Sequence, residues 1–271
     1  MEHLNNQAVQ RQLFTQYRCA AQSGLQLPHY SEAGFRVFSQ CDEDGILLYI
    51  YSLIGFANRL LLDIAFAGPY GANTTNLLCN WGFHGLLLEG SAAGVEASRQ
   101  FFAAHPDTAL LPPSIECAWV TAENINQILW QHKLSGEIDL FSLDVDGVDY
   151  WLWKSLTVVQ PRVVVVEACA YMGAELSVTV PYRPDFNRFD LHEWFCGASI
   201  QAFVKLAREK GYRLVAANRL GFNLFFVRND LAPALLPEIS AQDCFRFEPE
   251  PLRLRRQERL KSVSGFGWVE V

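Results

Sequence analysis

The sequence lacks the features that place a protein in a membrane or on a nucleic acid. No apolar run reaches the roughly 18 residues that a membrane-spanning helix requires. The first residues have neither the basic head nor the apolar core of a secretory signal. The 29 acidic residues outnumber the 22 basic ones, and the formal net charge of −7 disfavours a phosphate backbone as partner. We therefore expect a cytoplasmic protein that binds neither a membrane nor nucleic acid.

Several enzyme classes also lack support. Seven cysteines are scattered without C-x-x-C spacing, which favours reduced thiols over a zinc site or a disulfide framework. There is no G-x-S-x-G elbow, no phosphate-binding glycine–lysine loop and no H-E-x-x-H, so hydrolase, kinase and zinc-protease interpretations are excluded. The one basic cluster, Arg253–Arg256 with Arg259 and Lys261, alternates with Leu and Glu, and this favours a solvated helix over an interaction arm.

Helical and strand patterns alternate through most of the chain. Apolar runs predict strands over 60–64, 85–88, 114–120, 137–145, 163–168, 212–217 and 224–228. Helical periodicity lies between them, and residues 218–223 are too few for a helical crossover, so the last pair of strands must be antiparallel. The order predicts a doubly wound α/β fold with a seven-stranded, mostly parallel sheet. We expect a helical extension over 1–35, the α/β domain over 36–230 and a C-terminal extension over 231–271.

The most informative segment, 60–91, reads as strand, small-residue turn, helix and second strand. Ala65, Gly68 and Gly71 are small enough to let a ligand approach the backbone. Glu89 ends the second strand, where an acid can accept hydrogen bonds from a ribose diol. The segment predicts a site for an adenosine-containing cofactor, and the alternative is a scaffold without a ligand.

A second group of polar residues follows two later strands. Asp144 and Asp146 share one face at a strand end, and Glu167 ends the neighbouring valine-rich strand. Three uses remain open: capping of the next turn and helix, contact with a substrate or general-base work, and binding of Mg²⁺ or Ca²⁺ by all three carboxylates. His192, in the long aromatic segment 168–196, is a second candidate for the proton acceptor.

Several motifs, taken in order, resemble the FkbM-like class of S-adenosylmethionine-dependent methyltransferases. The resemblance covers about residues 36–230. It rests on Ser39-Gln40 with Glu43-Asp44-Gly45, Asp63 with Asn73-Thr74 and Leu77, Glu89-Gly90, Val120 to Asn124, Ser142 to Tyr150, Glu167 after Pro161-Arg162, and Gly197-Ala198-Ser199. Ala65 stands where the family has its first glycine, Pro69 stiffens the turn, and Cys169 replaces a common Asn.

The resemblance implies a class I methyltransferase fold with an N-terminal helical cap, and it implies roles by position. It assigns S-adenosylmethionine to Asp63, Ala65, Gly68, Gly71, Asn73, Glu89, Gly90, Ser91, Trp119 and Thr121. It assigns the acceptor to Glu43, Asp44, Glu167 and Tyr171, with Asp144, Asp146 or His192 taking the acceptor's proton.

The sequence thus favours an S-adenosylmethionine-dependent methyltransferase of a small or medium polar acceptor, most simply at oxygen. Alternatives are nitrogen or carbon methylation of a sugar or natural-product intermediate and a methyltransferase fold that binds without catalysis. A third alternative is a nicotinamide-linked reductase, which the antiparallel last strand disfavours. A magnesium ion at Asp144, Asp146 and Glu167 and a homo-oligomeric state are left open.

Overall fold

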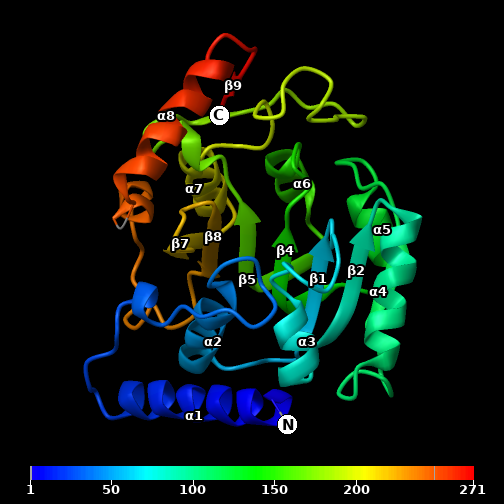
Figure 1. Cartoon of the computed structure of the whole chain (residues 1–271), viewed down its shortest axis with the longest axis vertical. Coiled ribbons are helices and arrows are strands. Elements are labelled where there is room, and N and C mark those ends of the chain that lie inside the picture. Colours follow the sequence, from blue (N-terminus) through cyan, green and yellow to red (C-terminus); the bar gives the residue numbers. More distant parts are fainter. Residues whose placement is uncertain (1, 247) are drawn as a thin grey trace.

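The computed structural model describes residues 2–246 and 248–271. Met1 and Phe247, which fall in the two predicted extensions, lie outside the described residues. Seven strands form one sheet in the order β3-β2-β1-β4-β5-β8-β7 (Figure 1). They are β1 (Leu60–Ile64), β2 (His84–Glu89), β3 (Ser114–Cys117), β4 (Gly136–Leu143), β5 (Val159–Glu167), β7 (Tyr212–Ala217) and β8 (Asn223–Arg228).

The sheet is parallel except at β8, which runs antiparallel to both of its neighbours, β5 and β7. The expected seven-stranded, mostly parallel sheet with an antiparallel final strand is therefore confirmed. Two strands end earlier than expected: β3 ends at Cys117, where the chain turns toward the next helix, and β4 ends at Leu143. The order also reverses between β1 and β4, and open α/β sheets bind ligands at the carboxyl ends of the strands beside such a reversal.

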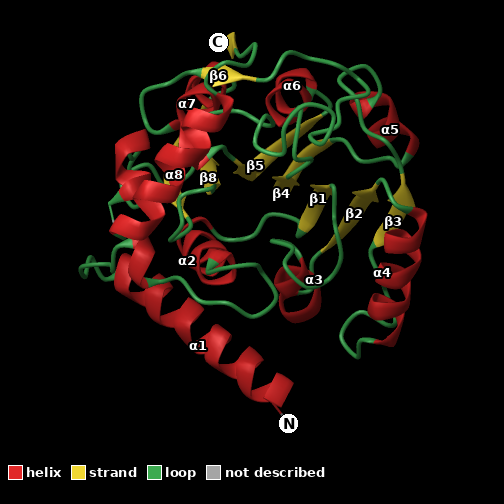
Figure 2. Ribbon diagram, turned by 45° about the horizontal axis from the view of Figure 1, so that its top comes forward, coloured by secondary structure: helices red, strands yellow, loops and turns green. Residues whose placement is uncertain are grey.

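Helices cover both faces of the sheet. They are α1 (Glu2–Gln22), α2 (Glu43–Ile54), α3 (Thr75–Trp81), α4 (Ala92–Ala104), α5 (Ile125–Gln131), α6 (Asp149–Ser155), α7 (Ile200–Glu209) and α8 (Glu250–Val263), with short 3-10 turns η1 (Tyr30–Glu32), η2 (Ala170–Met172) and η3 (Ala241–Phe245). Figure 2 shows α5, α6 and α7 on one side of the strands and α2 and α3 on the other.

Alternating residues of the central strands feed two separate cores. Leu62 and Val164 belong to one hydrophobic cluster, and Leu61 and Val163 belong to the other. Since both faces of β5 are covered, nearly every position of that strand has to be apolar. This is why the valine run predicts a central strand. None of the described helices has the length and apolar character needed to cross a membrane.

The first helix packs at the end of the molecule opposite to the tips of β1, β4 and β5 (Figure 1). The Phe14 ring stacks on Phe56 with centroids 5.5 Å apart and lies 5.1 Å from the Trp81 ring. The indole N–H of Trp81 donates to the side-chain oxygen of Gln10 at 2.8 Å. The N-terminal helix predicted from the sequence is present, but it lies at the far end of the sheet from the strand tips.

The C-terminal segment lies at the same end of the molecule as the strand tips (Figure 1). Strand β9 (Val269–Glu270) pairs with β6 (Val178–Thr179) in a small second sheet. The Val271 amide also donates to the Ser177 carbonyl at 3.0 Å. These contacts fasten the long aromatic segment and bring α8 beside the edge where a ligand is expected.

Candidate functional site

Two cavities open at the carboxyl ends of the central strands, on either side of the turn that follows β4. Val145, Gly147 and Val148 line the first cavity, and Asp146 and Asp149 line the second. We call the first the Glu89 cavity and the second the Glu167 cavity, after the acid that ends β2 or β5 in each. Because a single turn borders both, a group bound in one cavity lies close to a group bound in the other.

The Glu89 cavity has a volume of about 180 Å³ and lies across the ends of β1, β2 and β4. Two aromatic side chains, Trp119 and Phe186, line it. The indole N–H of Trp119 donates to the Pro184 carbonyl at 2.7 Å, which holds the ring in place. A Cβ at Gly147 would lie 2.7 Å from the Phe186 ring, so only glycine lets that ring approach the turn. The cavity therefore has flat apolar walls suited to a planar base.

Glu89 offers this cavity one free carboxylate oxygen. Its Oε1 accepts the Ser91 amide at 2.8 Å, while Oε2 takes no hydrogen bond from the described residues. The Ser91 hydroxyl is used as well, because it accepts the Gly94 amide and caps α4. Glu89 is thus oriented by the start of α4 and retains one carboxylate oxygen that can accept a hydrogen bond.

The turn after β1 differs from the expected cradle of free amides. The amides of Ala65 and Phe66 both donate to the Leu88 carbonyl, at 2.8 and 3.0 Å, and the Gly71 amide donates to the Phe38 carbonyl at 2.7 Å. Ala65 alone of this turn lines the cavity, and Gly68 and Gly71 border neither cavity. The expectation that both glycines line the cofactor site is corrected, because both lie outside the two cavities, and the Gly71 amide is used by the loop that contains Phe38.

Asp63 lies behind the Glu89 cavity, buried beside Ser142 of the neighbouring strand. The Thr74 hydroxyl donates to its Oδ2 at 2.5 Å, and burial raises the pKa of Asp63 to about 7. Asn73 donates to the Ser142 hydroxyl at 3.4 Å, and its own Oδ1 is buried without a partner among the described residues. These side chains form a polar support beneath the site.

The predicted cofactor residues therefore divide into two groups. Ala65, Glu89, Gly90 and Trp119 line the Glu89 cavity, whereas Asp63, Gly68, Gly71, Asn73, Ser91 and Thr121 do not. Thr121 caps the start of α5 instead: its hydroxyl accepts the Asn124 amide at 3.3 Å, and its amide donates to the Asn124 side chain at 2.8 Å. The residues of the second group lie near the Glu89 cavity in the fold but do not line it.

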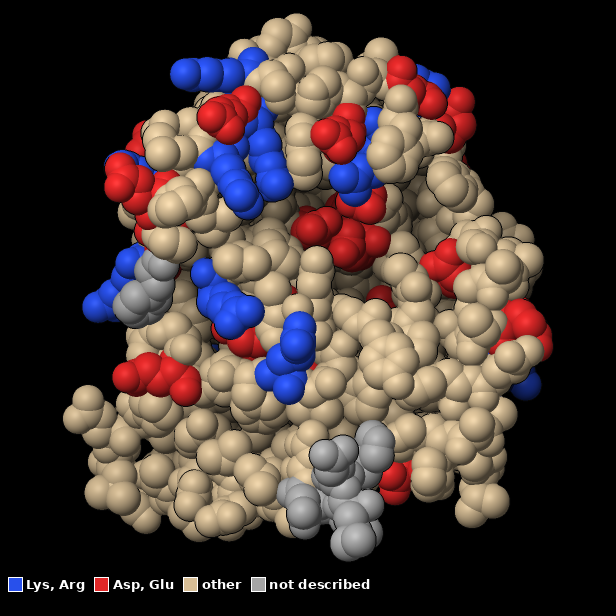
Figure 3. Space-filling model, in the orientation of Figure 1, with Lys and Arg blue, Asp and Glu red and all other residues tan. Residues whose placement is uncertain are grey.

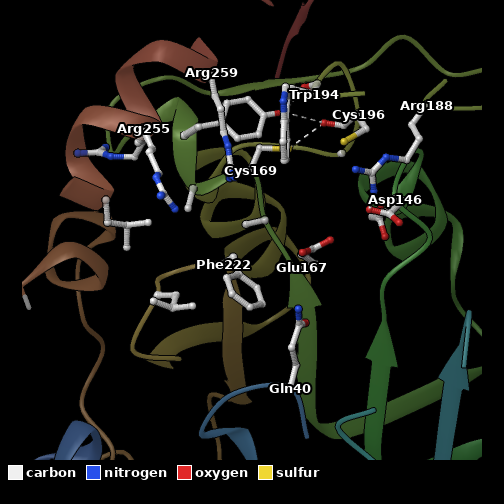
Figure 4. Close-up of a pocket in the computed structure, with 18 of the residues that line it drawn as sticks. Gln40, Asp146, Glu167, Cys169, Arg188, Trp194, Cys196, Phe222, Arg255 and Arg259 are labelled. Atoms are coloured by element: carbon white, nitrogen blue, oxygen red, sulfur yellow. Dashed lines mark hydrogen bonds and ion pairs between the residues drawn. The ribbon is translucent and has the colours of Figure 1, made fainter. Parts of the chain in front are cut away.

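The Glu167 cavity is larger, at about 330 Å³, and chemically mixed. Its lining joins acids from the ends of β4 and β5, aromatic rings, two thiols and several arginines: Asp146, Asp149, Glu167, Tyr171, Trp194, Phe222, Cys169, Cys196, Arg188, Arg255, Arg256 and Arg259. Figure 4 shows Glu167 at the tip of its strand, facing Asp146 and Arg188 on one side and Gln40 on the other.

Asp144, Asp146 and Glu167 come together as the sequence predicts, but Asp144 and Asp146 do not share a strand face, because β4 ends at Leu143 and both lie in the turn that follows. Each offers a carboxylate oxygen, and these oxygens lie within 4.8 Å of one another. Asp144 and Glu167 share a hydrogen bond. Burial raises the pKa of both, and the Asp144 carboxylate raises that of Glu167 further. Asp146 forms an ion pair with Arg188.

The turn that carries Asp144 and Asp146 is held by Asp149, the first residue of α6. Its two carboxylate oxygens accept the amides of Val145 and Gly147, at 2.7 and 2.9 Å. Burial raises the pKa of Asp149 to about 7, and the nearby Asp144 adds to the effect. Asp146 has a left-handed backbone (φ +53°), a conformation that L-residues adopt at a cost. Such strain is found where a side chain must face a site.

Glu43 and Asp44 do not border either cavity, which corrects their predicted role over the acceptor. Both are buried. Glu43 accepts the side-chain amides of Asn218 and Asn223, at 2.8 and 2.9 Å. Asp44 Oδ2 accepts backbone amides at 2.7–2.9 Å from residues 37–39. Their hydrogen bonds hold the loop before α2 and the β7–β8 turn, and the second oxygen of Asp44, Oδ1, is buried without a partner among the described residues.

His192 also lies outside both cavities. Its Nδ1 accepts the Trp194 amide at 3.1 Å, and its ring packs 5.8 Å from the Phe266 ring. The histidine therefore helps to fold the aromatic segment against the C-terminal end, and its predicted role as proton acceptor is corrected. Tyr171 does line the Glu167 cavity, where its hydroxyl bonds the Trp194 carbonyl and the Cys169 thiol.

Sequence reasoning missed the arginines of the Glu167 cavity. The C-terminal cluster was interpreted as a solvated helix, and α8 is that helix, but Arg255, Arg256 and Arg259 face the cavity. The i, i+4 spacing of Arg255 and Arg259 was the available signal. It could not show which element the face would meet, because that depends on how the C-terminal segment docks.

No protein-family model and no curated protein matches this chain. Among solved structures, it is similar to monomeric WbdD (17% identity, TM-score 0.37), covering 63% of this chain and 36% of that one. The chain thus spans about a third of the length of WbdD. It is also similar to the N-terminal domain of EvdMO1 with SAH bound (14% identity, TM-score 0.44), covering 84% of this chain and 95% of that one. A third is the glycopeptide N-methyltransferase MtfA complexed with S-adenosylhomocysteine (13%, 0.43), covering 73% and 94%. Such likeness assigns no function here.

Proposed function

We propose that this chain is an S-adenosylmethionine-dependent methyltransferase that methylates an oxygen of a small polar acceptor. The observation that carries the proposal is the pair of cavities on either side of the turn after β4. One has a free carboxylate oxygen and aromatic walls, and the other is lined by Glu167, whose carboxyl group hydrogen-bonds to that of Asp144. The methyl group would pass from the first to the second beside that turn.

The Glu89 cavity supports the cofactor part of the proposal. It lies where the strand order reverses, which is the expected ligand position in an open α/β sheet. Trp119 and Phe186 would flank the adenine ring, and the free Glu89 oxygen would accept hydrogen bonds from the ribose. Asp63 and Asn73, which are buried beneath the cavity, would support the methionine end from below without touching it.

The Glu167 cavity supports the chemical step. The acceptor oxygen forms a bond to the methyl carbon while the carbon–sulfur bond breaks, and the bonding pair returns to sulfur to give the neutral thioether. The acceptor's hydroxyl proton passes to the Asp144–Glu167 pair, which already holds its carboxyls close together. Alignment of donor and acceptor supplies most of the rate, and proton removal adds to it.

A second candidate, a fold that binds the nucleoside without catalysis, is favoured by one feature. The turn after β1 has alanine instead of glycine at position 65, and the amides of Ala65, Phe66 and Gly71 are already paired. That feature weakens the grip on the methionine end but leaves the Glu89 cavity intact. An activity assay separates the two candidates. A methyltransferase methylates an acceptor only when S-adenosylmethionine is present, whereas a fold that binds without catalysis does not methylate it at all.

Calorimetry with S-adenosylhomocysteine and with S-adenosylmethionine tests the cofactor assignment. Wild type should bind both in the micromolar range. Glu89→Ala should weaken binding by about 2 kcal/mol, about thirtyfold, because a charge-assisted hydrogen bond to the ribose is lost. Glu96→Ala, at an exposed position of α4, is the matched control and should bind as wild type does. Failure of wild type to bind either nucleoside at millimolar concentration would overturn the proposal.

A further inference from the structure

Helix α8 places arginines on the wall of the Glu167 cavity. Arg255 and Arg259 are four residues apart, share one face of the helix and both line the cavity. Figure 4 shows the two side chains reaching from α8 toward the space in front of Glu167 and Asp146. In Figure 3, basic side chains gather beside the acidic ones at the central hollow. The cavity therefore has an acidic end and a basic end.

The acids of the cavity leave these two arginines unpaired. Arg256 forms an ion pair with Glu248 at 3.0 Å, and Arg188 forms one with Asp146. Neither Arg255 nor Arg259 has a carboxylate partner among the described residues. In a chain of net charge −7, two cations thus face a shared cavity without a counter-charge from the chain itself.

Arg259 is held ready for a planar anion. Its guanidinium carbon lies 3.8 Å from the centre of the Trp194 ring, so the planar group rests on the indole face. The Trp194 carbonyl in turn accepts the Tyr171 hydroxyl. A guanidinium fixed in this way loses little side-chain freedom on binding, and its fork matches a carboxylate or a phosphate.

The size and walls of the cavity limit the rest of the ligand. About 330 Å³ is near the lower end of the roughly 300–1,000 Å³ range of small-molecule pockets. Tyr171 and Phe222 supply apolar surface for a carbon skeleton. The acidic end suits a neutral hydroxyl that donates a hydrogen bond, and it repels an anion.

We propose that the acceptor is a small hydroxylated acid. Its carboxylate or phosphate binds Arg255 and Arg259, and its hydroxyl faces Glu167, the carboxyl group that hydrogen-bonds to Asp144. This inference rests on the proposed methyltransferase function and names the substrate class of the same site. The two arginines act as specificity determinants that orient the acceptor, since the reacting oxygen lies at the other end of the cavity.

Calorimetry with simple anions tests the arginine site directly. Inorganic phosphate and benzoate are titrated separately into the full chain saturated with S-adenosylhomocysteine. Wild type should bind at least one of them in the millimolar range, and the tighter one identifies the anionic group. R255Q/R259Q should weaken this binding at least tenfold.

The same helix supplies a matched control, R253Q/K261Q. It removes the same number of charges from α8, but Arg253 pairs with Glu250 on the surface and neither residue lines the cavity. Its binding should stay within twofold of wild type. Equal weakening in both double variants, or no binding of either anion to wild type, overturns the inference.

Two further measurements distinguish failure of the acceptor assignment from failure of the proposed methyltransferase function. Binding of S-adenosylhomocysteine to each variant reports on the proposed function: retained nucleoside binding without anion binding overturns the acceptor class alone. Arg259→Lys keeps the charge but lacks the planar fork, and should bind the anion several-fold more weakly than wild type without loosening α8. If R259K binds like wild type, the stacked guanidinium has no part in recognition.

Discussion

Ala65 combines a strained backbone with a position on the wall of the Glu89 cavity. It follows β1, lines the Glu89 cavity and has a left-handed backbone with φ +66°. Most L-residues avoid this region, because the Cβ approaches the neighbouring carbonyl oxygen at a cost of about 1–2 kcal/mol. At the end of β1, position 65 thus has a backbone conformation that suits glycine, although the residue there is alanine.

Ala65→Gly should therefore stabilise the protein by about 0.5–1 kcal/mol, because relief of the strain exceeds the extra chain entropy that glycine loses on folding. Urea unfolding monitored by tryptophan fluorescence measures the change. Ala67→Gly, in the same turn but without a positive φ, is the matched control and should lose about 0.5–1 kcal/mol. A loss of stability in A65G would show that the methyl contacts outweigh the strain.

Asp63 makes stability depend on pH. Burial raises its pKa to about 7 in the folded protein, whereas an aspartate in an unfolded chain titrates near pH 3.9. Between these values the folded state binds more protons than the unfolded state, so this group makes stability fall as pH rises from about 4 to about 7.

Asp63→Asn removes that titration, and the variant should gain about 2–4 kcal/mol relative to wild type between pH 4 and pH 7. Urea unfolding of both proteins at pH 4, 5.5 and 7 gives the difference directly. Stability curves that stay parallel over this range would contradict the assignment of a raised pKa to Asp63.

At the scale of elements, the loop before α2 depends on a single carboxylate. Asp44 Oδ2 accepts three successive backbone amides, from Val37, Phe38 and Ser39. The neighbouring Gly45 packs so closely that a Cβ there would lie 2.3 Å from the Ala33 carbonyl oxygen. The Glu43-Asp44-Gly45 motif therefore holds the loop before α2 in place, and this loop brings Gln40 to the edge of the Glu167 cavity.

Asp44→Ala should cost about 3 kcal/mol, because it leaves buried amides without an acceptor. Asp44→Asn keeps one acceptor oxygen and should cost clearly less. Urea unfolding of the three proteins measures both changes. Equal losses in the two variants would mean that the amides find other partners and that the carboxylate does not organise the loop.

At the scale of the whole molecule, the Glu167 cavity is assembled from segments far apart in the chain. The turn after β4, the tip of β5, the aromatic segment and α8 each contribute charged side chains. Within this assembly Arg188 forms an ion pair with Asp146, and a hydrogen bond joins the Asp144 and Glu167 carboxyl groups. The chain's own groups thus compensate the three carboxylates that could otherwise hold a cation.

Methyl transfer should accordingly persist after treatment with EDTA and dialysis, within about twofold of the untreated rate. The measurement is transfer of a labelled methyl group to an accepted hydroxy acid, with and without added Mg²⁺. Loss of activity that Mg²⁺ restores would instead assign a divalent ion to Asp144, Asp146 and Glu167, whose oxygens lie close enough to share one.

The order of strands and helices could be read from the sequence, because apolar periodicity and short links are local properties of the chain. The bounds of β1 and β7 agree with the expected 60–64 and 212–217, and the acids at 89, 144, 146 and 167 fall at strand ends, where parallel topology brings them to one edge. Only the tertiary structure decided the functions of Glu43, Asp44, Gly71, His192 and the α8 arginines. The contacts of these residues depend on packing between segments that are distant in the sequence. Only that packing makes a buried acid accept the amides of a loop, or places a polar helix on the wall of a cavity.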